Sequence, residues 1–260
     1  MTPTLSNPFV WAFTAHTAVL WVLVLTRITG LLAALPLLGA DNMPLQLRAA
    51  FAALLALILV PVVPAPADIP AGVPALLATM GGELAIGLIL GTVVAWIIEA
   101  VAFAGALMDM QMGFSFVQFL DPSTSQNTSV SGSFLVQAAS VLIFVTGLHR
   151  EMILALVDSY RVAPIGQGVP LQAMGFIVLL GQLLMKGFQL AFPVLAVLFL
   201  MDLVLGISGK FMPQLQLLQL SFPVKIALGL VILGLMLRQL EPWLVPLFER
   251  APRIALRLLG

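Results

Sequence analysis

Charge is scarce in this chain. Only 8% of its 260 residues are charged and 61% are hydrophobic, whereas an ordinary soluble domain carries about 25% charged residues. No water-soluble fold hides that much apolar surface, so the composition predicts an integral membrane protein. Because one crossing takes about 20 helical residues, the length allows six or seven apolar helices in a single membrane-embedded domain, 1–260.

Cysteine is absent, and His16 and His149 are the only histidines. The chain therefore lacks disulfides, thiolate nucleophiles and cysteine metal sites. It also lacks HExxH, GxSxG and P-loop patterns, so we expect no catalysis, no metal and no cofactor. Eleven basic and eleven acidic residues cancel, and no overall field favours nucleic acid as a partner.

Aromatic residues are few, and the apolar runs do not show the alternation of apolar and polar residues that is typical of barrel strands. One tyrosine and four tryptophans are too few for the two aromatic girdles of a transmembrane barrel. Residues 1–26 carry no charge, unlike the basic start of a cleavable signal, so we interpret 10–25 as a retained helix. These absences favour an all-α membrane protein.

Seven apolar runs follow one another along the chain. Two of them are uncertain: 100–120 is weakly apolar, and 171–201 is either one helix kinked at Pro193 or a tight hairpin. A proline-rich loop (61–74), a polar loop (121–133) and a charged loop (150–161) separate the runs, and a tail, 241–260, carries Arg250, Arg253 and Arg257. The expected helices cover about 10–35, 49–63, 73–98, 100–120, 134–148, 171–201 and 223–240.

Basic residues mark the cytoplasmic side of a membrane protein. In the loops they fall at Arg48, within 150–161 and in the tail, whereas the N-terminus and the loops 64–74 and 121–133 have none. If 100–120 is a crossing and 171–201 is one helix, the C-terminus is cytoplasmic and the N-terminus periplasmic. Lys210 lies on the wrong side of this scheme.

Ionisable residues within the apolar runs would each cost about 2.5–3.5 kcal/mol at the bilayer centre. Asp202 and Lys225 flank a turn around Pro213, and we expect them to pair across a hairpin. For Glu83 and Asp109, which lack an obvious basic partner, a polar interface or water path and a structural role stay open. The buried polar or intersubunit candidates are Glu83, Asp109, Gln111, Lys186, Asp202 and Lys225.

Small residues suggest where helices pack closely. Gly87 and Gly91 form a GxxxG step, and Gly105 lies further along; small residues at this spacing let helices approach one another. The same step serves packing within the chain or against another subunit.

The run 107–120 mixes methionine and phenylalanine next to the polar loop. Such side chains make either an ordinary core stripe or a deformable apolar seal. The candidate constriction residues are Met110, Met112, Gly113, Phe114, Phe116 and Phe119.

An ordered series of residues from about 10 to 240 resembles the FliR family of flagellar export proteins. The series comprises Arg27, Gly30, Pro36, Gly39, Pro44, Arg48, Glu83, Gly87, Gly91, Gly105, Asp109, Gln111, Gly113, Gly147, His149, Ser159, Pro164, Gly166, Pro193, Asp202, Gly206, Pro213, Gln214, Pro223 and Lys225.

The resemblance implies a subunit of the flagellar type III export gate in the bacterial inner membrane, at the flagellar basal body. The implied partners are FliP-like, FliQ-like, FlhA-like and FlhB-like proteins, membrane lipid and unfolded flagellar substrates. The implied fold joins a FliP-like part (1–170) to a FliQ-like hairpin (171–240) ahead of the basic tail (241–260). The resemblance also implies a pore plug, expected at 110–119.

Two other functions stay open at this point. The first is the equivalent gate subunit of an injectisome. The second is a small-molecule secondary transporter, in which Glu83, Asp109 or Lys186 would be coupling sites near the midplane. An inverted repeat would favour the transporter, and the sequence shows none.

Overall fold

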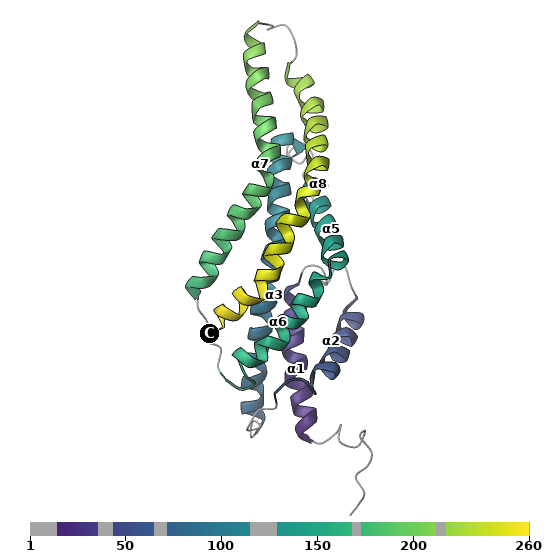
Figure 1. Cartoon of the computed structure of the whole chain (residues 1–260), viewed down its shortest axis with the longest axis vertical. Coiled ribbons are helices and arrows are strands. Elements are labelled where there is room, and N and C mark those ends of the chain that lie inside the picture. The colour runs from purple at the N-terminus through teal and green to yellow at the C-terminus, as the bar shows by residue number, and fades with distance from the viewer. Residues whose placement is uncertain are drawn as a thin grey trace, which may run out of the picture. The chain divides into compact units, whose positions relative to one another are not determined.

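The computed structural model describes residues 15–35, 44–64, 72–114, 129–167, 173–211 and 217–259. In these ranges the secondary structure is α-helical, without strands (Figure 1). This confirms the all-α class. The helices are α1 (Ala15–Ala34), α2 (Leu45–Leu59), α3 (Val73–Met112), α5 (Val130–Val145), α6 (Leu148–Val162), α7 (Ala173–Phe211) and α8 (Leu217–Leu258).

Four of these helices, α1, α3, α7 and α8, are long and apolar enough to cross a membrane, and α5 with α6 supplies a fifth if the pair is one broken span. Helix α2 has 15 residues. At 1.5 Å per residue it is about 22 Å long, which is less than the hydrocarbon thickness of about 30 Å. The lengths and composition make this chain an integral membrane protein.

Helix α3 corrects the expected division of 73–120 into two helices. Its 40 residues run without interruption, so 73–98 and 100–120 are not two separate crossings. Glu99 is exposed, while its neighbours Ile98 and Ala100 are buried. A single charged side chain on the outer face of a helix does not require a turn, which is why the run continues through it.

Helix α6 corrects the expected charged loop at 150–161. Leu156, Ser159 and Tyr160 are buried on one face, whereas Asp158 and Arg161 are exposed on the other. Glu151 in the first turn and Arg161 in the last complement the helix dipole. The segment is an amphipathic helix, whose low average hydropathy conceals it in the sequence.

Helices α7 and α8 run side by side in opposite directions (Figure 1). Two contacts join them: Lys225 pairs with Asp202, and the indole of Trp243 donates to the backbone carbonyl of Lys186. Helix α7 is one helix with Pro193 inside it, not a hairpin in itself. Helix α8 continues to Leu258, so most of the expected tail is helical.

The helices group into two compact units. Unit 1 contains α1, α2, α3 up to Ala95, α6 from His149 and α8 from Arg250. Unit 2 contains α3 from Trp96, α5, α7 from Phe176 and α8 up to Glu249.

In unit 1, α1 and α3 touch through their backbones at glycine. A Cβ placed on Gly87 would lie 2.0 Å from the carbonyl oxygen of Arg27, and one on Gly91 would lie 2.5 Å from that of Leu31. On α1, Gly30 meets the backbone of Leu84 in the same way. No side chain fits at these positions, so small residues set the distance between the two helices.

We predict that Gly87→Ala destabilises the chain although alanine favours helix. Its methyl group has no space, and overpacking typically costs about 1–3 kcal/mol. Gly82→Ala on the same helix is the matched control, because a Cβ there meets nothing within 4 Å and helix propensity gains up to about 1 kcal/mol. Thermal unfolding in mild detergent should show a lowered Tm for Gly87→Ala alone; equal Tm values would contradict the proposed packing.

Candidate functional site

The most buried polar cluster in the described residues centres on Arg27 of α1. Its side chain is fully enclosed. Its Nε donates to Glu83 Oε2 on α3 at 2.6 Å, forming an ion pair. One terminal nitrogen donates to Ser159 Oγ at 2.9 Å and the other to the carbonyl oxygen of Ala163 at 2.9 Å. The Arg27 cluster therefore joins α1, α3 and α6 in unit 1.

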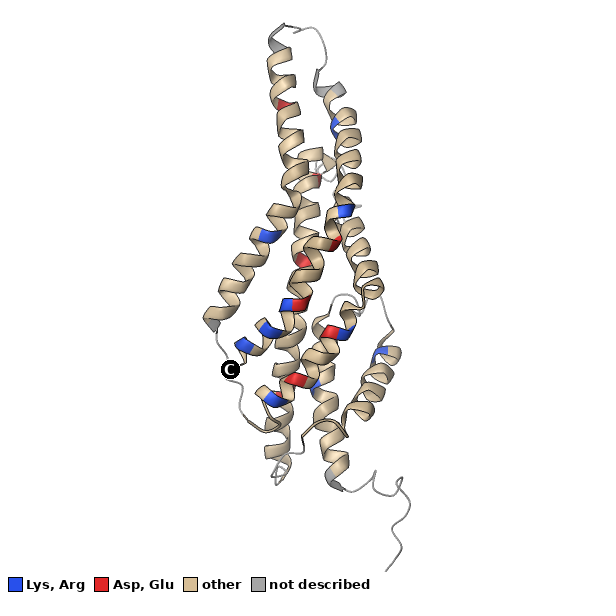
Figure 2. Cartoon of the chain, in the orientation of Figure 1, with Lys and Arg blue, Asp and Glu red and all other residues tan. Residues whose placement is uncertain are grey.

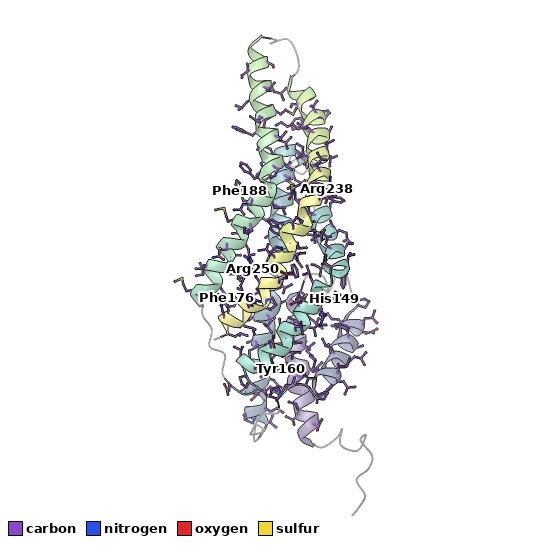
Figure 3. All side chains as sticks on the ribbon, in the orientation of Figure 1. His149, Tyr160, Phe176, Phe188, Arg238 and Arg250 are labelled. Atoms are coloured by element: carbon purple, nitrogen blue, oxygen red, sulfur yellow. The ribbon has the colours of Figure 1, made fainter. Side chains whose placement is uncertain are left out.

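The ring of Tyr160 completes this cluster. The Arg27 guanidinium carbon lies 4.0 Å from the ring centroid, within the range of a cation–π interaction. Tyr160 is itself buried, and Figure 3 shows it on α6. Each nitrogen of the guanidinium thus has a hydrogen-bond acceptor, and the ring of Tyr160 lies over the group. Such compensation for lost hydration is the condition under which a charge is tolerated in an apolar interior.

Glu83 therefore does have a basic partner. Arg27 is 56 residues away in the sequence, so it is not an obvious nearby partner. The pairing depends on the glycine crossing, which brings the backbone at Arg27 against α3. The sequence does not identify this ion pair, because neither Arg27 nor Glu83 has the other as a near neighbour in the chain.

Asp109 forms a second buried site, in unit 2, and has no ion pair with any residue that the structure describes. Its carboxylate accepts from Ser129 Oγ at 2.6 Å and from the backbone N–H of Ser131 at 3.1 Å. Ser129 is the N-cap of α5 and accepts from the N–H of Gly132. Asp109 on α3 thus holds the first turn of α5, where a negative charge is favourable.

A close contact supports the same junction. A Cβ on Gly105 would lie 2.3 Å from Gly132, so α3 and α5 touch through backbone atoms one turn from Asp109. These observations show how the carboxylate reaches the end of a neighbouring helix.

Three polar side chains form a third cluster, where α3, α7 and α8 meet in unit 2. Lys225 Nζ lies 2.5 Å from Asp202 Oδ1, and the Gln111 side-chain amide donates to Asp202 Oδ2 at 3.0 Å. The Asp202 side chain is 37% exposed and that of Lys225 is 18% exposed, so this pair is weaker than the enclosed one at Arg27. Lys186 is exposed and lies apart from this cluster.

The candidate constriction residues divide into two groups. Met110 is 68% exposed, whereas Met112 is fully buried and packs close to Gly229 of α8. Gly113 has φ +89°, which ends the helical geometry of α3, and it lies close to the Phe222 ring. Phe114 is half-buried, and Phe116 and Phe119 lie outside the described residues.

Within the described ranges no group of three or more His, Cys, Asp or Glu could hold a metal ion. The three polar clusters instead connect helices: α1 with α3 and α6, α3 with α5, and α3 with α7 and α8.

We predict that breaking the Arg27–Glu83 pair is costly but replacing both members is less so. Removing one partner leaves a buried charge alone and costs about 3–5 kcal/mol, whereas apolar replacement of a whole buried pair is often neutral. Arg27→Met and Glu83→Met should each lower the Tm in detergent, and the double variant should recover part of the loss.

The control for these single and double variants is the exposed pair of Arg161 and Asp158 on α6, whose charged atoms lie 3.6 Å apart. Such surface pairs contribute about 0–1 kcal/mol, so Arg161→Met should leave the Tm almost unchanged. A double variant as unstable as the sum of the two single variants would refute the coupling.

Comparison with known proteins assigns the chain to a family. The profile of the family described as "Bacterial export proteins, family 1" matches residues 18–251. The chain is 31% identical to the flagellar biosynthetic protein FliR of Caulobacter vibrioides over 89% of this chain and 92% of that protein. It is 28% identical to FliR of Escherichia coli, covering 86% and 87%, and 27% identical to the Yop proteins translocation protein T of Yersinia pestis, covering 82% and 84%.

These matches confirm the resemblance inferred from the residue series. They extend over both compact units, since the matched range begins in α1 and ends in α8. The chain belongs to the bacterial export proteins of family 1, with relatives among the FliR proteins of flagellar biosynthesis.

Proposed function

We propose that this chain is a subunit of the flagellar type III protein-export gate. The match to the bacterial export family along residues 18–251 carries the proposal, together with FliR relatives aligned over most of both chains. The chain acts by forming part of a passage for unfolded flagellar proteins, not by catalysis. It resides in the bacterial inner membrane at the flagellar basal body. The unbroken α3 removes the crossing count on which the expected topology depended, and the cytoplasmic placement of the C-terminal end depends on its arginines alone.

The distribution of exposed apolar surface supports assembly with other subunits. Within the most apolar stretch of each helix, 61% of α3 is buried inside the chain. The corresponding share is only 22% for α7 and 17% for α8. Large side chains are exposed on both helices, among them Phe188 and Phe192 on α7 and Leu230 and Leu235 on α8. Large apolar side chains exposed along a whole helix need lipid or protein against them.

The partners we propose are FliP-like and FliQ-like subunits in one complex, with FlhA-like and FlhB-like export proteins beside it. Residues 1–170 would form the FliP-like part, 171–240 the FliQ-like hairpin and 241–260 the basic C-terminal segment. The antiparallel pairing of α7 with α8 supports a hairpin in the second part. The exposed apolar face of this hairpin is where we expect neighbouring subunits.

The constriction we propose lies at 110–119. Met110 would contribute to the apolar seal with Phe114, Phe116 and Phe119, because a hydrophobic constriction blocks water and ions until a chain displaces it. Met112 and Gly113 contact α8 and would anchor the seal.

An injectisome gate subunit is the second candidate. The Yersinia translocation protein aligns over 82% of this chain at an identity only slightly below that of the flagellar relatives. A secondary transporter receives less support, because Glu83 is already neutralised by Arg27 and Asp109 by the α5 terminus.

Co-purification tests the assignment. The tagged chain, co-expressed with its genomic neighbours and extracted in mild detergent, should bring down FliP-like and FliQ-like chains in one stable complex, identified by mass spectrometry. A solitary chain or a homodimer from the same co-expression would overturn the export-gate proposal. Recovery of injectisome-type neighbours would favour the second candidate.

Deletion within 110–119 tests the seal. If these residues close the passage, the deletion should raise ion leakage through the assembled complex in vesicles, measured with a membrane-potential dye. Deletion of 121–126 from the adjacent polar loop is the control and should leak less. An intact barrier after deletion within 110–119, in a complex with all its subunits, would indicate a scaffold and not a seal.

A further inference from the structure

The end of α8 presents a row of arginines that none of the polar clusters uses. Arg250, Arg253 and Arg257 are all exposed, whereas Ala251, Ala255 and Leu258 are buried. At 100° per residue, the three arginines fall within an arc of about 60°, and the buried residues lie on the other side. This segment is an amphipathic helix docked by its apolar face within unit 1.

The arginines have no acidic partner among the residues that the structure describes. The three ion pairs in these ranges are those of Arg27, Arg161 and Lys225. Glu249, four residues before Arg253, is exposed and forms none of them. Figure 2 shows basic positions gathered along the last turns of α8 near the C-terminus, and Figure 3 marks Arg250 among them.

The length and charge pattern of α8 indicate where this row lies in a membrane. With 42 residues, α8 is about 63 Å long, twice the hydrocarbon thickness of about 30 Å. Residues 226–237 carry no charge, and every charged residue of α8 except Lys225 follows them. The charged end therefore belongs at the headgroup level or beyond it, because charged side chains are costly within the hydrocarbon.

We propose that Arg250, Arg253 and Arg257 form a binding surface for the headgroups of anionic phospholipids. A guanidinium offers paired donors that match the oxygens of a phosphate, and three of them are held on one rigid helical face. A chain embedded in a bilayer meets phospholipid at high local concentration without recruiting any partner. This proposal depends on membrane insertion and not on the export function.

The surface fixes how deeply the end of α8 sits. Basic residues near an anionic leaflet each strengthen attachment by about fivefold. Three arginines on one helical face therefore give the chain a preference for anionic over zwitterionic lipid. Three arginines scattered over the surface do not give this preference.

Lipid retention by the purified full-length chain tests the proposal. The chain in mild detergent is mixed with phosphatidylglycerol or phosphatidylcholine, and the bound lipids are counted by native mass spectrometry. The expected result is preferential retention of phosphatidylglycerol, reduced about tenfold or more by the triple variant Arg250→Gln, Arg253→Gln and Arg257→Gln. All three side chains are exposed, so the Tm of this variant should match that of the unaltered chain.

The matched control removes the same charge elsewhere, in Arg48→Gln, Arg150→Gln and Arg238→Gln, and should keep the preference. Equal losses in both triple variants would show diffuse attraction and overturn the proposed surface. Displacement of phosphatidylglycerol by millimolar inorganic phosphate would indicate a free-anion site and overturn the lipid assignment. Unchanged phosphatidylglycerol retention by the variant altered at Arg250, Arg253 and Arg257 would also overturn it.

Discussion

The buried guanidinium of Arg27 is the constraint around which unit 1 is built. A charge fully enclosed by protein is stable only when its partners replace the lost hydration. Here the partners come from three segments distant in sequence: Glu83 on α3, Ser159 and Tyr160 on α6, and the carbonyl oxygen of Ala163 just after α6. Because each contact has a fixed reach, the cluster determines how α1, α3 and α6 are placed against one another.

The glycines of α1 and α3 make this cluster possible. Gly30, Gly87 and Gly91 bring the two backbones into direct contact, and Arg27 lies at the same crossing. Apolar packing alone supplies little orientation in a membrane, where lipid tails compete with side chains for the same contacts. The glycines set the distance and the ion pair sets the register, so the two features depend on each other.

The sequence predicted the parts of this structure that depend on local patterns. The all-α class follows from long apolar runs, and the pairing of Asp202 with Lys225 follows from the single turn between them. Helix α6 was missed because its buried face carries Ser159 and Tyr160 beside charged neighbours, which lowers its average hydropathy. The unbroken α3 differs from the expected separate helices 73–98 and 100–120, because the weaker hydropathy of the second segment does not interrupt the helix.

The tertiary partners were beyond sequence reasoning for a different reason. Arg27 pairs with a residue 56 positions away and bonds to one 132 positions away, and no periodicity relates such positions. Asp109 likewise gains its partner from the cap of α5, twenty residues on. In a chain with so few charges, each buried one has few possible partners.

The same reasoning explains the contrast between the interior and the outer helices. Polar clusters join α3 to α1, α5, α6, α7 and α8, so α3 is largely enclosed by its own chain. Helices α7 and α8 pair Asp202 with Lys225 and with Gln111, and large apolar side chains lie exposed along their outer faces. An apolar stretch of this kind places no directional demand on its neighbour, so it accepts lipid or another helix equally. Selection of a protein partner there must come from shape and from small-residue contacts, as it does between α1 and α3.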